Sequence, residues 1–298
     1  MVPVDADSRM SLVRHEYPVQ MSEAPTLEDD LQKRLDQVIA ERERINALEA
    51  QGLPPTRSLL FVGPPGVGKT MSARWLASQL GRPLITLDLA TVMSSYLGKT
   101  GSNIRSALEY AKGVDSVLLL DEFDAIAKRR DDEGDVGELK RLVNVLLQEI
   151  DDWPASSLLI AATNHGELLD PAIWRRFDEV MHFSMPDPSR REEYLRTLFA
   201  DDDGVRAWIP VVVTAWDKVS PSDMARVVRN VRRRAAVMDI PVSEALIDLV
   251  SPELRAAPPA ARQKAAVILS DAGVSDRQIS AAIGISRDTL RRTRNSKT

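Results

Sequence analysis

The feature that most constrains this chain is a glycine-rich segment between an apolar run and a helical pattern. Residues 59–62 read Leu-Leu-Phe-Val and predict a strand, and residues 71–80 predict a helix. A G-x-x-x-x-G-K-[ST] loop between them binds phosphates through its backbone N–H groups, with the lysine on the β- and γ-phosphates and the hydroxyl on Mg²⁺. The segment therefore predicts a site for ATP and Mg²⁺, formed by Gly63, Pro64, Pro65, Gly66, Val67, Gly68, Lys69, Thr70 and Met71.

Strand and helix patterns alternate around this loop. Apolar runs predict five strands, at 59–62, 84–87, 117–120, 158–161 and 180–183, with helical periods between them. This order is typical of an α/β fold with a parallel sheet covered on both faces. We expect four regions: a flexible arm (1–25), a large α/β nucleotide-binding domain (26–187), a small all-helical lid domain (188–255) and a trihelical module (258–298).

Polar side chains follow two of the predicted strands. Asp121 and Glu122 come directly after the strand at 117–120, and Asn164 follows the strand at 158–161. We assign Asp121, with Thr70, to Mg²⁺ and Glu122 to the general base that deprotonates the attacking water. Asn164 is expected to hold that water or the γ-phosphate. The alternatives are a strand that simply ends at the surface and an asparagine that stabilises a turn.

Taken in order, these motifs resemble the AAA ATPase family, in particular its remodelling branch of FtsH, katanin and Vps4 relatives. The resemblance covers about residues 26–250 and includes residues 169–178, Leu-Asp-Pro-Ala-Ile-Trp-Arg-Arg-Phe-Asp. It implies a Mg²⁺-dependent ATPase that works as a homo-hexamer. Arg175 and Arg176 would then be arginine fingers that reach the γ-phosphate bound by the neighbouring subunit; the alternative is a surface pair in a local salt network.

The same resemblance implies a pore loop that grips a protein substrate. Tyr96, Leu97 and Gly98 lie between the second strand and the next helix, where related motors carry an aromatic-aliphatic-glycine loop. An ordinary buried Tyr-Leu pair is the alternative, and the adjacent Lys99 would equally suit a phosphate backbone. Near residues 220–224 the lid signature of the family lacks its γ-phosphate-sensing arginine, which leaves Arg226 and Arg229 as the remaining candidates for a nucleotide contact from the lid.

The C-terminal segment is basic in an acidic chain. The net charge is −5, but residues 255–298 hold nine Lys/Arg and three Asp/Glu. Three short helical patterns there resemble the helix-turn-helix of resolvases, and a protein-docking module is the alternative. If the module binds DNA, the expected contacts are Arg287, Asp288, Arg291, Arg292 and Arg294.

Composition excludes several other classes of function. The chain has no cysteine, and its three histidines are scattered, so disulfides, thiolate sites and histidine metal clusters are not expected. Apolar runs reach about five residues, against about twenty for a membrane span. Together with the resemblance to the AAA family, this predicts a cytoplasmic, ATP-driven protein remodeller that its C-terminal module recruits to DNA or to a partner, with a separate protease as a further partner and no membrane. A DNA-associated regulatory ATPase of transposition, recombination or defence is the alternative.

Overall fold

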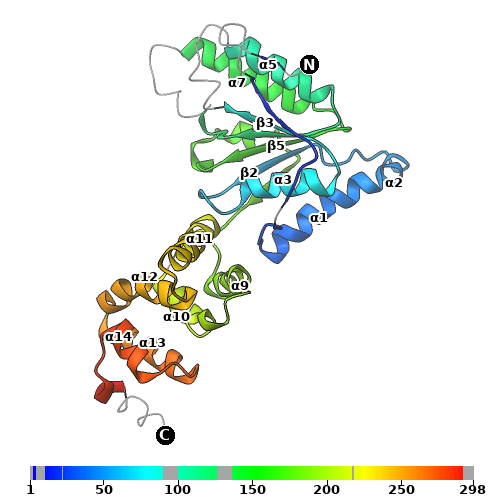
Figure 1. The fold of residues 1–298 in the computed structure, drawn as a ribbon. Helices are drawn as coiled ribbons and strands as arrows, with labels where there is room; N and C mark the ends of the chain where they lie inside the picture. The colour runs from blue at the N-terminus through cyan, green and yellow to red at the C-terminus, as the bar shows by residue number, and fades with distance from the viewer. Residues whose placement is uncertain are drawn as a thin grey trace. The chain divides into compact units, whose positions relative to one another are not determined.

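The computed structural model describes residues 3–4, 11–21, 23–89, 100–125, 136–216 and 218–290. The chain divides into two compact units, Met1–Ser184 and Met185–Thr298, which Figure 1 shows as an α/β part and an all-helical part.

The first unit is built on a six-stranded sheet in the order β1-β3-β4-β5-β2-β6. Its five predicted strands are confirmed, and they pair in parallel. Their bounds are β2 (Ser58–Val62), β3 (Leu84–Asp88), β4 (Val117–Asp121), β5 (Leu158–Thr163) and β6 (Glu179–His182). The helices are α1 (Asp29–Glu43), α2 (Ile45–Glu49), α3 (Lys69–Gln79), α5 (Thr100–Lys112), α7 (Val136–Asp151) and α8 (Pro171–Trp174).

Helices cover both faces of this sheet, as the continuous apolar strands require. Figure 1 shows α5 and α7 over one face and α3 with α1 over the other. On the first face, Leu118 and Leu120 of β4 join a buried cluster with Leu108 of α5 and Leu146 of α7. Side chains alternate along a strand, so Leu119, also fully buried, faces the α3 side.

The predicted count of five strands was wrong by one. β1 (Arg14–Glu16), from the segment expected to be a flexible arm, pairs antiparallel with β3. The Glu16 carboxylate accepts two hydrogen bonds from the Arg74 guanidinium, at 2.5 and 2.7 Å, and Val13 is buried. Three residues are too few to show an alternating pattern, and the pairing depends on contacts with distant segments.

The second unit consists of helices around one hydrophobic core. They are α9 (Pro188–Leu198), α10 (Ile209–Ala215), α11 (Pro221–Met238), α12 (Val242–Ala256), α13 (Pro259–Asp271) and α14 (Asp276–Ile283). The prediction treated residues 258–298 as a separate module. Leu269 of α13 and Ile279 of α14 nevertheless belong to the same buried cluster as Met224 and Leu246.

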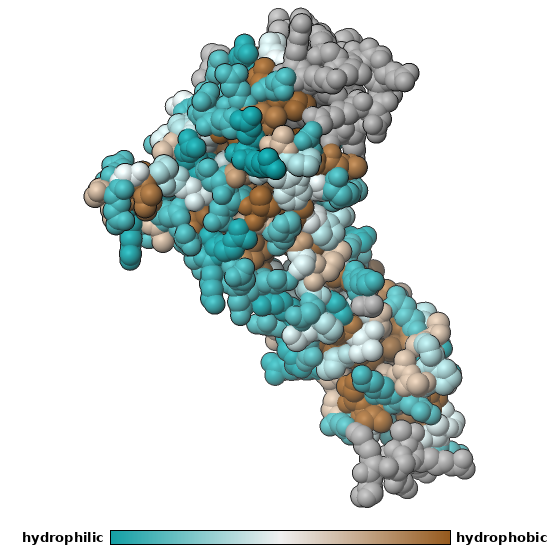
Figure 2. All heavy atoms as spheres, turned by 180° about the vertical axis from the view of Figure 1, so that it is seen from behind, coloured by the Kyte–Doolittle hydropathy of each residue, from teal (hydrophilic) through white to brown (hydrophobic). Residues whose placement is uncertain are grey.

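The surface is mainly hydrophilic on the face shown in Figure 2, where hydrophobic residues form small, separate groups. No helix within the described ranges is both long and apolar enough to cross a membrane.

Candidate functional site

Parallel pairing brings the predicted nucleotide-binding residues to one edge of the sheet. β4, β5 and β2 are neighbours, so the segments that follow them meet at their carboxyl ends. Gly63 N–H donates to the Thr163 carbonyl at 3.3 Å, and Phe123 N–H donates to the Ala162 carbonyl at 2.9 Å. The glycine-rich loop at residues 63–70 (the P-loop), the acidic pair Asp121 and Glu122, and Asn164 therefore form one site, although they come from three separate parts of the sequence.

Three positions of the P-loop require glycine for structural reasons. Gly66 and Gly68 have φ angles of 79° and 104°, in the left-handed region that favours glycine. At Gly63 a side chain is excluded by space, because a Cβ there would overlap the carbonyl oxygen of Phe183. The loop consequently follows the sheet edge closely, and its backbone N–H groups precede the first turn of α3.

Lys69 is buried at the centre of this site, with 7% of its surface exposed. Its Nζ donates hydrogen bonds to the carbonyls of Gly63 at 2.6 Å and Pro64 at 2.9 Å, and to Asn164 Oδ1 at 2.7 Å. Burial lowers the pKa of Lys69 to about 8, although the carboxylates of Asp121 and Asp124 act in the opposite direction. The amine therefore lies directly beside Asn164, the residue expected to hold the attacking water or the γ-phosphate.

This lowered pKa predicts a pH-dependent affinity for ATP. Below pH 8 the Lys69 amine is protonated and attracts phosphate, and above pH 8 it becomes neutral. The apparent affinity should therefore fall about tenfold for each pH unit above about 8. Equilibrium binding of a fluorescent ATP analogue between pH 7 and pH 9.5 measures it. Lys69→Ala should bind weakly with no such slope, and a flat wild-type profile would contradict the assignment.

The acidic pair lies at the end of β4, as predicted. Thr70 Oγ1 donates to Asp121 Oδ2 at 3.1 Å, so the two predicted Mg²⁺ ligands are adjacent. A hydroxyl and a carboxylate are oxygen ligands of the kind that Mg²⁺ prefers. Glu122 has a φ of 53°, unusual for a residue with a side chain, and its N–H donates to Asp121 Oδ1 at 3.0 Å.

Asp124 completes the site and was missing from the predicted set. It is 3% exposed, and its Oδ1 accepts hydrogen bonds from Thr163 Oγ1 at 3.1 Å and Asn164 N–H at 3.4 Å. Asp124 therefore fixes the backbone from which the Asn164 side chain reaches Lys69. The sequence signal was present, because Asp124 follows the same strand by three residues, but its partner lies 40 residues away.

The two predicted arginine fingers lie in a different place. They follow α8, which is capped by the Asp170 side chain accepting from Ala172 N–H at 2.8 Å. Arg175 and Arg176 are both exposed, and Arg176 forms an ion pair with Asp151, the last residue of α7. They are not part of the site around Lys69.

Several predicted residues lie outside the described part of the chain. These are the pore-loop candidates Tyr96, Leu97 and Gly98, and three of the DNA-contact candidates, Arg291, Arg292 and Arg294. The other two, Arg287 and Asp288, are exposed at the start of a helix whose Ser286 Oγ accepts from Thr289 N–H at 3.2 Å.

Comparison with known proteins adds to this geometry. The family model described as "ATPase family associated with various cellular activities (AAA)" matches residues 59–185. These residues form an AAA ATPase domain. The match begins in β2 and ends just beyond β6, so the AAA domain contains the P-loop, the acidic pair, Asn164 and both arginines.

Curated relatives agree with this assignment of the AAA domain. An uncharacterized AAA family ATPase, y4kL, of Sinorhizobium fredii is 45% identical over 162 residues, or 54% of this chain and 49% of that protein. Proteasome-activating nucleotidase 1 of Haloferax volcanii is 32% identical over 195 residues, or 63% and 48%. The FtsH zinc metalloprotease of Alkalihalophilus pseudofirmus is 33% identical over 175 residues, or 56% and 26%. The chain thus spans half or less of the length of these relatives.

A solved structure shows the same fold. The crystal structure of the FIGL-1 AAA domain covers 76% of both chains with a TM-score of 0.61 and 21% sequence identity.

Proposed function

We propose that this chain is an ATPase whose active site is completed by a neighbouring copy of the chain, and that it uses ATP to remodel proteins. Four of the required groups form two hydrogen-bonded pairs at this sheet edge, Lys69 with Asn164 and Thr70 with Asp121. The AAA domain supports the use of ATP.

The side chains of this site have separate roles in the proposed reaction. Lys69 binds the β- and γ-phosphates, and Asn164 orients the water or the terminal phosphate. Glu122 takes the proton from the attacking water. Thr70 and Asp121 would hold Mg²⁺, which when bound neutralises negative charge on the phosphates. The described residues contain no cluster of three His, Cys, Asp or Glu side chains that could hold a metal, so the ion would also depend on the phosphates.

The observation that carries the shared-site proposal is the separation between the arginines and the P-loop. Asp178, two residues after Arg176, hydrogen-bonds to the first residue of β2, whereas Gly63 follows the last residue of β2. Four steps of about 3.3 Å make this strand about 13 Å long. Arg176 also points to Asp151 in its own chain. The position of these arginines therefore fits phosphate chemistry at the nucleotide site of another subunit better than at the site of their own chain.

Assembly-dependent hydrolysis tests this proposal. The ATPase rate per subunit should rise with protein concentration and reach a plateau once the chain is assembled, because an isolated subunit lacks the arginines that complete its site. Turnover is measured by phosphate release in parallel with light scattering. Equal turnover by a species that scatters as a monomer would contradict the shared site.

Protein remodelling is the part of the proposal that comes from similarity. Proteasome-activating nucleotidase 1 and FtsH are named for the proteasome and for a metalloprotease. We infer a protein substrate, a hexamer and a pore loop at Tyr96, Leu97 and Gly98, with a separate protease as a partner. Tyr96→Ala should then retain ATPase activity while losing remodelling of whatever protein co-purifies with an ATP-trapped variant.

The second candidate is a DNA-associated regulatory ATPase. It is favoured by Arg287, which is exposed in the first turn of a helix, where side chains of a recognition helix approach bases. DNA-stimulated hydrolysis that disappears with Arg287→Ala would favour this candidate. Salt-insensitive hydrolysis that DNA does not change would exclude it.

A further inference from the structure

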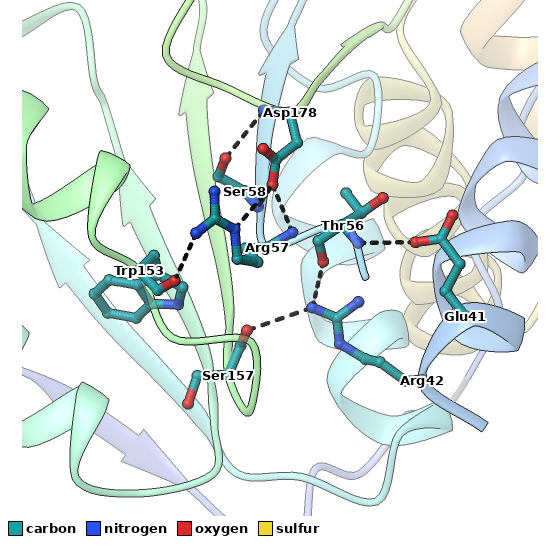
Figure 3. A network of polar contacts seen from close by, with 8 residues as sticks. All are labelled: Glu41, Arg42, Thr56, Arg57, Ser58, Trp153, Ser157 and Asp178. Atoms are coloured by element: carbon teal, nitrogen blue, oxygen red, sulfur yellow. Dashed lines mark hydrogen bonds and ion pairs between the residues drawn. The ribbon is translucent and has the colours of Figure 1, made fainter. Parts of the chain in front are cut away.

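Near the amino-terminal ends of β2 and β5, polar side chains connect segments that are distant in sequence (Figure 3). Arg42 of α1 donates to the carbonyls of Thr56 at 2.6 Å and Ser157 at 3.4 Å. Arg57 donates to the Trp153 carbonyl at 3.5 Å. None of these residues belongs to the nucleotide site. The network also includes Asp178, however, which lies two residues after Arg176.

Asp178 is the most densely bonded member of this network. Its Oδ2 accepts hydrogen bonds from the backbone N–H groups of Arg57 at 2.7 Å and Ser58 at 3.1 Å. Its own N–H donates to Ser58 Oγ at 3.0 Å, and the Arg57 Nε lies 3.8 Å from the carboxylate. Figure 3 shows the Asp178 side chain directed at the backbone of Arg57 and Ser58. Main-chain and side-chain bonds together fix this residue to β2.

The residue before Asp178 is fixed by packing. Phe177 is 6% exposed and lies edge-on to Phe123, with ring centroids 5.9 Å apart. Two consecutive residues after Arg176 are thus anchored, one by hydrophobic contact and one by hydrogen bonds. The arginines themselves remain exposed on this anchored base.

We infer that Asp178 is a positioning residue for hydrolysis in the neighbouring subunit: it fixes Arg175 and Arg176 to the first residues of β2 and so sets where they are presented. This inference rests on the proposed shared site. It gives a reason for a carboxylate at this point, because one oxygen accepts two adjacent backbone N–H groups. It also joins the arginines to the strand that leads into the P-loop of their own chain.

The expected effect is a loss of turnover with nucleotide binding retained. Asp178→Ala should lower kcat about 10- to 100-fold, because small displacements of catalytic groups have effects of this size. The affinity of the variant for an ATP analogue should stay unchanged, since its own P-loop site is intact. Asp178→Asn retains an oxygen that can accept both N–H bonds and should stay within about threefold of wild type.

A mixing experiment separates positioning from simple damage. Lys69→Ala subunits bind nucleotide too weakly to hydrolyse it but still present intact arginines, whereas Asp178→Ala subunits bind nucleotide but present misplaced arginines. Mixing the two full-length variants should therefore give more activity than the sum of the separate activities. No gain is expected with a Lys69→Ala/Arg175→Ala/Arg176→Ala partner, which presents no arginines.

A neighbouring variant is the matched control. Glu179 follows Asp178 directly and pairs with Arg34 at 3.0 Å, with both side chains about one-third exposed. Glu179→Ala should change kcat by less than about twofold, because exposed ion pairs contribute little. If Asp178→Ala fails to fold, Ser58→Ala removes only the acceptor of the Asp178 N–H. Ser58→Ala should lower kcat about threefold, and mixing it with Lys69→Ala subunits should restore the activity.

The outcomes distinguish this inference from the function on which it rests. Mixing Arg175→Ala/Arg176→Ala with Lys69→Ala tests the shared site alone, and no gain there would reject that site. If that mixture gains activity but Asp178→Ala hydrolyses ATP at the wild-type rate, positioning by Asp178 is rejected. The same conclusion follows if the Asp178→Ala loss is not restored by Lys69→Ala subunits.

Discussion

Replacing Arg175 and Arg176 together by alanine is expected to lower kcat for ATP hydrolysis about 10³- to 10⁵-fold. The guanidinium groups neutralise charge that develops in the transition state, and this charge is largely absent from bound ATP. The affinity for ATP should therefore change little. Phosphate release under saturating ATP, together with analogue binding, measures the two quantities separately.

The control for this double substitution is another exposed arginine. Arg196 of α9 is ion-paired with Glu192 at 2.6 Å and is about as exposed as Arg176. Arg196→Ala should leave turnover unchanged. Wild-type hydrolysis by the Arg175→Ala/Arg176→Ala protein would refute the composite site, and with it the proposed dependence of hydrolysis on assembly.

Replacing Glu122 by glutamine is expected to lower kcat about 10²- to 10⁴-fold, the usual contribution of a general base. The amide has nearly the shape of the carboxylate but cannot take the proton from water. Because Lys69, Thr70 and Asp121 remain, the variant should bind ATP and retain it. Single-turnover hydrolysis and retention of labelled ATP on the purified protein provide the measurements.

A surface glutamate gives the comparison for this variant. Glu109 is exposed on α5, and Glu109→Gln should hydrolyse ATP like the wild type. If Glu122→Gln also keeps its turnover, another group acts as the base. If it retains ATP as expected, the same protein can be used to capture substrates, since an arrested assembly should hold what it normally releases.

The nucleotide site could be predicted from the sequence because its signals are local. A strand, a glycine-rich loop and a helix follow one another at fixed spacing around Lys69, and Asp121 directly ends an apolar run. Parallel pairing then brings such strand ends together without any further information. The adjacency of Thr70 to Asp121 and of Lys69 to Asn164 follows from this rule.

The features that were not predicted from the sequence depend on residues that are far apart in the chain. Asp178 bonds to residues 120 and 121 positions earlier, and β1 pairs with a strand about 70 residues later. The shared core of α13 and α14 with the preceding helices was missed for another reason. Prolines at 258 and 259 suggested a linker, but a proline fits the first turn of a helix equally well, and Pro259 begins α13.

The short strand β1 has a practical consequence for work on the AAA domain. An expression clone cut to begin at α1, or at residue 59 where the family match starts, would lack Arg14–Glu16. The outer backbone groups of β3 would then be uncovered, and an uncovered strand invites intermolecular pairing and precipitation. Fragments intended for biochemistry are therefore best started upstream of Ser11.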